Sequence, residues 1–450
     1  MRKLAQTYRD MARYPQAESL FKKVLKAQRT TLGEKANATL DTAVDLGAIY
    51  YSIGRFPEAD AMLTRIVQVR RRLYPNQLAD LFDAVEALAS VCSEEGKLDA
   101  AERYANEAVE IARRLHGDDH PDTLKARRIL VVIYRWKKEI DAAEKLQAEV
   151  LAGDRRVLGA EHPRTLIDMN NLGTIYRLEG RYSESAGMMR QLLEISRRIN
   201  GSENMYTLIY ENGLVQTLYS LCGFAEAEPL AVKNQETFKR LFGEDNQWTI
   251  TSARTLGLIY NAEGRFKEAE PILLKVLEDT RRVQGAEHLN VATATTYLGV
   301  LYLNEGKNDL AEQTLTEALA LDRKRLQPGE LATRTCLTAL ARLRLTQRKY
   351  TETEALLREA MNGTGNQNTQ IWDTFDRQSL LGAALLGQGK YAEAEPLLLS
   401  GYEGLQKQSP AISVDANLPE AGQRLVQLYT AWGKPGQAGE WRHKLTTNTQ

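Results

Sequence analysis

Five histidines and three cysteines are the residues of this 450-residue chain best suited to metal binding or nucleophilic chemistry. One repeated position holds His120, His162, His288, Asn204 and Asn246. Because an imidazole and an amide can both accept a backbone N–H at the start of a helix, this exchange predicts helix caps. The capping histidines are at least one repeat apart, and His116 and His443 are isolated, whereas metal ligands must lie close together. We therefore expect no metal site.

The cysteines form neither a catalytic nor a disulfide pattern. Cys92 replaces an aromatic residue that packs between helices, and Cys222 replaces a glycine that ends a helix. These two and Cys336 are far apart and lack a histidine at motif spacing, which favours free, buried thiols in a reducing compartment. No glycine-rich segment matches a phosphate-binding loop. We predict no enzymatic activity, no cofactor and a cytoplasmic location.

The overall composition narrows the classes of partner. Lys and Arg together number 59, as do Asp and Glu, so no basic surplus indicates nucleic acid. No apolar run approaches the ~18 residues of a membrane span. Met1 to Lys3 lead directly into repeat residues, without a signal peptide. We expect no nucleic-acid or membrane partner, and a first repeat truncated at residues 1–3.

A period of 42 residues organises nearly the whole chain. In each copy a small residue follows a turn that contains an aromatic residue or a glycine. These small residues are Ala17, Ala59, Ala101, Ala143, Ser185, Ala227, Ala269, Ala311 and Thr353, with further copies at Ala394 and Ala438. A fixed period of this length is typical of a solenoid, in which each unit buries its apolar face against its neighbours.

Each copy has the pattern of two helices. In the unit 161–200, apolar residues recur at three- and four-residue spacing from Leu166 to Tyr176, and Gly180 then ends that helix. A second amphipathic segment from Tyr182 to Ile195 follows. Eleven such units without a strand pattern predict an all-α solenoid.

The repeat resembles the tetratricopeptide (TPR) pattern, through Leu172-Gly173-x-x-Tyr176 and Gly180-Arg181-Tyr182. The segment Gly159-Ala160-Glu161-His162-Pro163 is similar to the kinesin-light-chain type of this repeat. The resemblance implies a right-handed superhelix of about eleven helix pairs, with a concave groove that receives peptide segments. We expect one solenoid over residues 1–450, with a bend or loop at 361–370 and a terminal capping repeat at 411–445.

The last repeats resemble the C-terminal arrays of large bacterial serine/threonine kinases, through Ala394-Glu395-Pro396 and the segment around Trp432 and Trp441. No kinase motif is present in this chain. Two hypotheses therefore remain: a scaffold that binds a partner protein, or the regulatory region of a larger bacterial kinase or transcription regulator. The two tryptophans are expected to cover the open end of the last repeat.

The side of the first helix opposite its packed stripe predicts the binding surface. At 100° per residue, Asn170, Thr174 and Arg177 lie on that side. Arginine and asparagine can hold carboxylates and peptide amides, so an acidic partner peptide is expected. The predicted groove consists of Lys125, Arg128, Arg135, Asn170, Arg177, Asn212, Tyr219, Arg254 and Asn261. Later repeats add an apolar stripe at Val300, Leu303, Leu345 and Leu386. Such a stripe is either a pocket for ligand side chains or a dock for a segment of the protein's own chain.

Overall fold

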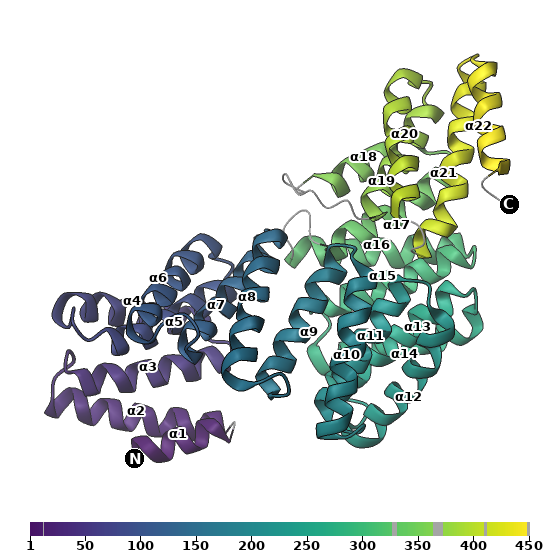
Figure 1. Cartoon of the computed structure of the whole chain (residues 1–450). Helices are drawn as coiled ribbons and strands as arrows, with labels where there is room; N and C mark the ends of the chain where they lie inside the picture. Colours follow the sequence, from purple (N-terminus) through teal and green to yellow (C-terminus); the bar gives the residue numbers. More distant parts are fainter. Residues whose placement is uncertain (12, 326–330, 363–371, 409–411, 448–450) are drawn as a thin grey trace. The chain divides into compact units, whose positions relative to one another are not determined.

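The computed structural model describes the whole chain except residues 12, 326–330, 363–371, 409–411 and 448–450. Every regular element in the described residues is an α-helix, and consecutive helices pack against each other from α1 to α8 and from α10 to α22 (Figure 1). These 22 helices confirm the predicted all-α array of about eleven helix pairs. The right-handed sense of a superhelix stays a prediction.

The chain divides into two compact units, residues 1–175 and 176–450, and each is described by itself. The boundary falls in the last turn of α9. Unit 1 contains α1 (Arg2–Asp10), α2 (Tyr14–Thr31), α3 (Asn37–Ser52), α4 (Phe56–Leu73), α5 (Leu78–Glu94), α6 (Leu98–His116), α7 (Pro121–Trp136), α8 (Ile140–Leu158) and most of α9 (Pro163–Leu178).

Unit 2 continues the same alternation. Its helices are α10 (Tyr182–Asn200), α11 (Met205–Ser220), α12 (Phe224–Phe242), α13 (Gln247–Ala262), α14 (Phe266–Gln284), α15 (Leu289–Asn304), α16 (Asn308–Arg325), α17 (Leu331–Thr346), α18 (Tyr350–Met361), α19 (Trp372–Gly387), α20 (Tyr391–Gln408), α21 (Ile412–Ala431) and α22 (Pro435–Thr447). The odd-numbered helices are the first helices of the pairs. Adjacent first helices contact each other from α1 to α7 in unit 1 and from α11 to α21 in unit 2.

In the pairs from α3–α4 to α21–α22, the turn between the two helices contains a left-handed residue, which explains the repeated glycine. Gly54 and Gly180, for example, have φ of 75° and 77°. Where the repeat has another residue, the left-handed conformation is retained: Lys138, Cys222 and Arg348 have φ of 63°, 66° and 58°. The turn geometry is therefore imposed by the packing of the two helices, and these three side chains adopt it despite its steric cost.

A second glycine position is explained by close contact between the two helices of a pair. A Cβ on Gly299 of α15 would lie 2.6 Å from Cγ of Leu315 on α16, and one on Gly382 of α19 would lie 2.6 Å from Cγ of Leu398 on α20. The small residue of the second helix is also enclosed by the packing, since Ala311 and Ala394 are fully buried. The Leu-Gly pair and the small residue therefore set the interhelical distance of the repeat.

The truncated first repeat, the bend or loop at 361–370 and the terminal capping repeat stay predictions. α1 is 9 residues long, whereas α3 has 16. The bend or loop predicted at 361–370 falls on residues outside the described part, after α18 has ended at Met361. At the C-terminal repeat, the Trp441 ring meets Tyr402 edge-on at 4.9 Å and the Trp432 ring lies 6.0 Å from Tyr391, so both tryptophans cover apolar core.

Candidate functional site

The helix-start position behaves as predicted. Nδ1 of His120, His162 and His288 accepts the backbone N–H two residues later, at 3.3, 3.2 and 3.1 Å. Oδ1 of Asn204 and Asn246 makes the same bond at 2.9 and 2.8 Å. The cap hypothesis for these five residues is therefore confirmed.

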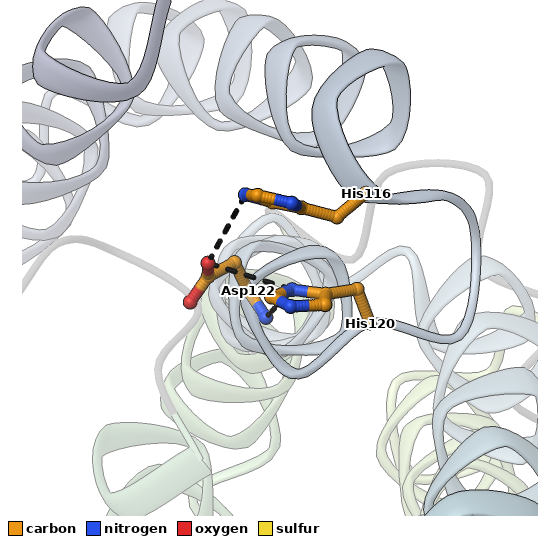
Figure 2. A group of neighbouring side chains, drawn as sticks. All are labelled: His116, His120 and Asp122. Carbon is orange, nitrogen blue, oxygen red and sulfur yellow. Dashed lines mark hydrogen bonds and ion pairs between the residues drawn. The ribbon is translucent and has the colours of Figure 1, made fainter.

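The expectation that His116 is isolated is wrong. Its ring stacks on that of His120, with centroids 4.1 Å apart and planes inclined by 23°. Asp122 lies beside both rings, as Figure 2 shows, with Oδ2 3.8 Å from Nε2 of His116 and 3.5 Å from Nδ1 of His120. The turn after Gly117, where φ is 91°, brings the last residue of α6 back to the start of α7. This trio is the group in the described part of the chain that could hold a metal ion.

The cysteines are poor candidates for a nucleophile. Cys92 and Cys336 are 2% and 0% exposed, and burial raises the pKa of their thiols to about 11 and about 12. Because the reactive form is the thiolate, both are inert at neutral pH. All three cysteines carry free thiols.

The residues of the predicted groove are divided between the units. Lys125, Arg128, Arg135 and Asn170 belong to unit 1, and Arg177, Asn212, Tyr219, Arg254 and Asn261 belong to unit 2. We call the side of the odd-numbered helices that carries these positions the first-helix face.

Arg128 on α7 is held by the protein's own carboxylates. Its Nε and Nη2 donate to Asp168 of α9 at 2.9 and 2.8 Å, and Nη2 also donates to Asp154 of α8. Both carboxylates are almost fully buried, and Gln147 donates to Asp168 Oδ1 at 3.2 Å. Burial raises the pKa of Asp154, and the neighbouring Asp168 raises it further. Arg128 therefore ties three helices together, and its charge is compensated within the fold.

The two carboxylates that hold Arg128 were missed by the sequence reasoning. Asp168 lies two residues before Asn170, so its helical phase differs from that of Asn170, Thr174 and Arg177, which defined the predicted surface. Asp154 belongs to the second helix of its pair, whereas the surface was predicted from first helices alone.

The rest of α7 differs from Arg128. Lys125 is 55% exposed and its Nζ lies 3.0 Å from Oε2 of Glu86 on α5. Arg135 is partly buried, which lowers the pKa of its guanidinium, and its buried Nε has no hydrogen-bond partner in the described residues. Val132 and Trp136 lie on the same side and are 41% and 57% exposed. Trp136 is a functional candidate that the sequence reasoning missed, although its phase is only 40° from that of Val132.

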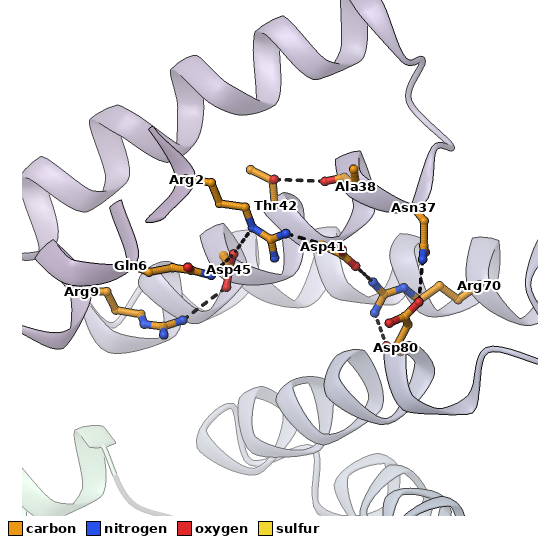
Figure 3. Close-up of polar contacts among 10 residues, drawn as sticks. All are labelled: Arg2, Gln6, Arg9, Asn37, Ala38, Asp41, Thr42, Asp45, Arg70 and Asp80. Atoms are coloured by element: carbon orange, nitrogen blue, oxygen red, sulfur yellow. Dashed lines mark hydrogen bonds and ion pairs between the residues drawn. The ribbon is translucent and has the colours of Figure 1, made fainter. Parts of the chain in front are cut away.

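Towards the start of unit 1 the first-helix face contains a compensated ion network (Figure 3). Arg2 and Arg9 of α1 both pair with Asp45 of α3, at 2.8 and 3.3 Å. Arg70 of α4 is 2% exposed and donates to Asp41 Oδ1 at 2.5 Å. Burial raises the pKa of Asp41, although Arg70 and Arg2 oppose this shift. These charges hold α1, α3 and α4 together and offer little free charge to a ligand.

In unit 2 the predicted amides are buried. Asn212 and Asn261 are 4% and 6% exposed, and Asn261 Oδ1 accepts a hydrogen bond from Asn304 Nδ2 at 3.2 Å. Burial raises the pKa of Tyr219 to about 12. The Arg254 guanidinium lies 5.9 Å from the centre of the Tyr297 ring. Of the groove residues in this unit, Asn212 and Asn261 thus form part of the packed interior, while Arg177 and Arg254 are partly exposed.

The predicted apolar stripe lies against the core. Val300 and Leu303 are half-buried against a cluster of α16, α17 and α18 residues. Leu345 and Leu386 pack against a larger cluster built from α17 to α22, which Tyr182 and Leu221 also join. α11 contacts α21 directly. Leu345 and Leu386 therefore pack against the protein's own core, and both interpretations of this stripe stay predictions.

An open cleft of about 750 Å³ lies on the second-helix side of unit 2. Its lining includes Leu193 of α10 and Pro229 and Leu230 of α12. Arg190 and Glu226 also line it, and they pair with each other at 3.2 and 2.7 Å. These two charges of the cleft therefore compensate each other.

Comparisons with known proteins agree on the architecture. The family model described as tetratricopeptide repeat matches residues 1–72, 80–135, 127–198, 206–278 and 253–324, together more than half of the chain. No curated protein sequence matches the chain. None of the described helices is long and apolar enough to span a membrane.

Several solved structures are similar in fold. A Rap protein complexed with competence and sporulation factor shares 14% identity, covers 92% of this chain and 99% of its own, and has a TM-score of 0.51. The apo form of RapI shares 11% identity over 82% of this chain and 98% of its own, with the same TM-score. The TPR-like repeats of a kinesin light chain from Podosopora anserina share 21% identity over 45% of this chain and 95% of their own, with a TM-score of 0.40.

Proposed function

The chain belongs to the tetratricopeptide repeat family, and on this premise we propose that it is a non-catalytic scaffold that binds an extended segment of a partner protein on the first-helix face of α7. Repeats of this family typically mediate protein–protein interaction. One observation carries the choice of α7: its face presents Val132 and Trp136 to solvent, next to the partly buried Arg135. We call these three residues the α7 patch.

The α7 patch suits a ligand with an apolar side chain and a nearby carboxylate. Tryptophan is enriched among the residues that dominate binding energies, because it buries a large area at little entropic cost. A carboxylate could accept hydrogen bonds from the partly exposed Arg135 guanidinium. Because Arg128 and Lys125 already have acidic partners within the protein, we assign the binding of the acidic peptide to Arg135 rather than to these two residues.

The fold is compatible with such a role. A Rap protein of similar fold is complexed with competence and sporulation factor. The regulatory alternative, in which this array belongs to a larger bacterial kinase or transcription regulator, and the cytoplasmic location both stay predictions.

A peptide array followed by calorimetry tests the proposal. The array holds acidic peptides with and without a Leu or Phe beside the Asp or Glu residues. Trp136→Ala should weaken binding of the apolar-acidic peptides at least tenfold, which corresponds to about 1.4 kcal/mol. Arg135→Gln should abolish the preference for acidic peptides and the weakening of binding by salt. Tyr206→Ala is the matched control, because this α11 aromatic is 54% exposed but lies in unit 2.

Two results would contradict the proposal. One is a loss of affinity in Tyr206→Ala as large as that in Trp136→Ala. The other is binding that neither α7 variant changes, which would place the site elsewhere.

A further inference from the structure

We infer that His116, His120 and Asp122 form a binding site for a divalent transition-metal ion, at the junction of α6 and α7. One ligand atom from each of the three residues lies within 4.8 Å of the others. Around a single Zn²⁺, ligand atoms are roughly 3–3.5 Å apart, given metal–ligand bonds of about 2.0–2.2 Å. The three side chains are 38%, 38% and 41% exposed, so they can close this difference without disturbing the core.

The ligand chemistry selects the class of ion. Two imidazoles and one carboxylate suit Zn²⁺, Ni²⁺ or Cu²⁺, whereas Mg²⁺ and Ca²⁺ prefer all-oxygen sites. Three protein ligands would leave one or more coordination positions for water or for a side chain from another molecule.

Metal binding competes with the hydrogen bond by which His120 caps α7, and this hydrogen bond is the longest among the five helix caps. Nδ1 of His120 accepts the Asp122 backbone N–H at 3.3 Å, the longest of the five cap distances given above. If His120 binds the metal through Nδ1, it must release this N–H, which lies in the first turn of α7 beside solvent-accessible side chains.

The surrounding charges also bear on the site. His116 lies at the C-terminus of α6, whose dipole favours a cation, while the N-terminus of α7 disfavours one and Asp122 offsets it. The next acids along the turn already have arginine partners: Asp118 pairs with Arg127 at 2.5 Å and Asp119 with Arg156 at 2.6 Å. These arginines reduce the repulsion between the neighbouring carboxylates. The ligand atoms for a metal ion would therefore come from His116, His120 and Asp122.

The repeat itself does not require this trio. The positions equivalent to His116 are held by Leu158, Asn200, Phe242 and Gln284, and those equivalent to Asp122 by Arg164, Tyr206, Trp248 and Asn290. Each of these repeats keeps its cap without the other two residues. The combination His-x-x-x-His-x-Asp is therefore an addition to the capping pattern in this one repeat, independent of the α7 patch.

Calorimetric titration of the full chain, free of any histidine-rich tag, tests the inference with Zn²⁺, Ni²⁺, Cu²⁺ and Mg²⁺ as single probes. His120→Asn is the informative variant, because Asn204 and Asn246 show that asparagine keeps the cap. His120→Asn and His116→Ala, each as a single variant, should lower the affinity for the transition metals at least tenfold. His162→Asn is the matched cap control and should leave the affinity unchanged. In Cu²⁺ electron paramagnetic resonance, the nitrogen couplings should fall from two imidazoles to one in His120→Asn.

The inference is overturned if none of the three transition metals binds, or if Mg²⁺ binds as well as they do. It is also overturned if His162→Asn reduces affinity as much as His120→Asn, since binding would then not depend on the trio. A retained two-nitrogen Cu²⁺ spectrum in His120→Asn would likewise exclude this ligand set.

Discussion

Asp322 on α16 provides a direct test of how this array tolerates a buried charge. Its side chain is 0% exposed, and neither carboxylate oxygen has a hydrogen-bond partner in the described residues. Burial raises the pKa of this carboxyl from 3.8 to about 6. We predict that Asp322→Asn stabilises the protein at neutral pH.

The size and the pH dependence of the effect follow from proton linkage. Because the pKa is raised in the folded state, the charged form destabilises the fold, and stability falls as pH rises from about 4 to about 6. A rise from 3.8 to about 6 corresponds to about 3 kcal/mol, at about 1.36 kcal/mol per unit. Above pH 6 the whole cost is present, and below pH 4 none of it is, since the carboxyl is then protonated in both states.

Urea unfolding and hydrogen exchange of α15 to α17, at pH 4, 5, 6 and 7.5, measure the change. Exchange is included because a repeat array need not unfold in one step. Asp322→Asn should raise the free energy of unfolding by about 2–3 kcal/mol at pH 7.5 and by little at pH 4. Asp376→Asn is the matched control: this aspartate is 2% exposed but pairs with Arg342 at 2.7 Å, so its replacement should destabilise the protein. A neutral or pH-independent effect of Asp322→Asn would refute the reasoning.

Two further predictions concern packing and thiol reactivity. Gly299→Ala should lower the free energy of unfolding by about 1–3 kcal/mol, because the new Cβ would lie 2.6 Å from Leu315 Cγ. Gly187→Ala on α10 should instead raise the free energy of unfolding by up to about 1 kcal/mol, because no atom lies within 4 Å of the new Cβ. Thermal denaturation compares the two, and equal effects would argue against the close contact. At pH 8, iodoacetamide should modify the partly exposed Cys222 first and spare Cys92 and Cys336, whose buried thiols have pKa values of about 11 and about 12. Intact-mass spectrometry follows the labelling, and similar rates at all three cysteines would contradict the assigned burial.

The repeat pattern was sufficient for the architecture because its constraints are local. Gly299 and Leu315 belong to one helix pair, so their close contact recurs where the same spacing recurs, as it does between Gly382 and Leu398. The helix-start caps act within two residues, and His162 needs only the N–H of Arg164. Such features could be predicted from the sequence, as could the family.

The candidate site was less predictable because helical phase gives the side of a helix but not the partner of a side chain. Arg128 was assigned correctly to α7, yet its carboxylates come from residues 26 and 40 positions further along the chain. Asn212 and Asn261 lie on the compared phases but are buried. Burial and charge compensation depend on how neighbouring helices pack, which the phase of a single helix does not contain.

The amino-acid sequence by itself determined the helix pairs, their turns and their caps, since each depends on residues that are close along the chain. Only the tertiary structure decided which charges are neutralised, as at Arg128, and which side chains stay exposed, as at Trp136. It also brought His116 onto His120 across a turn. The physical reason is the same in each case: desolvation and ion pairing depend on distances in space between helices, whereas propensity and capping act over one or two turns.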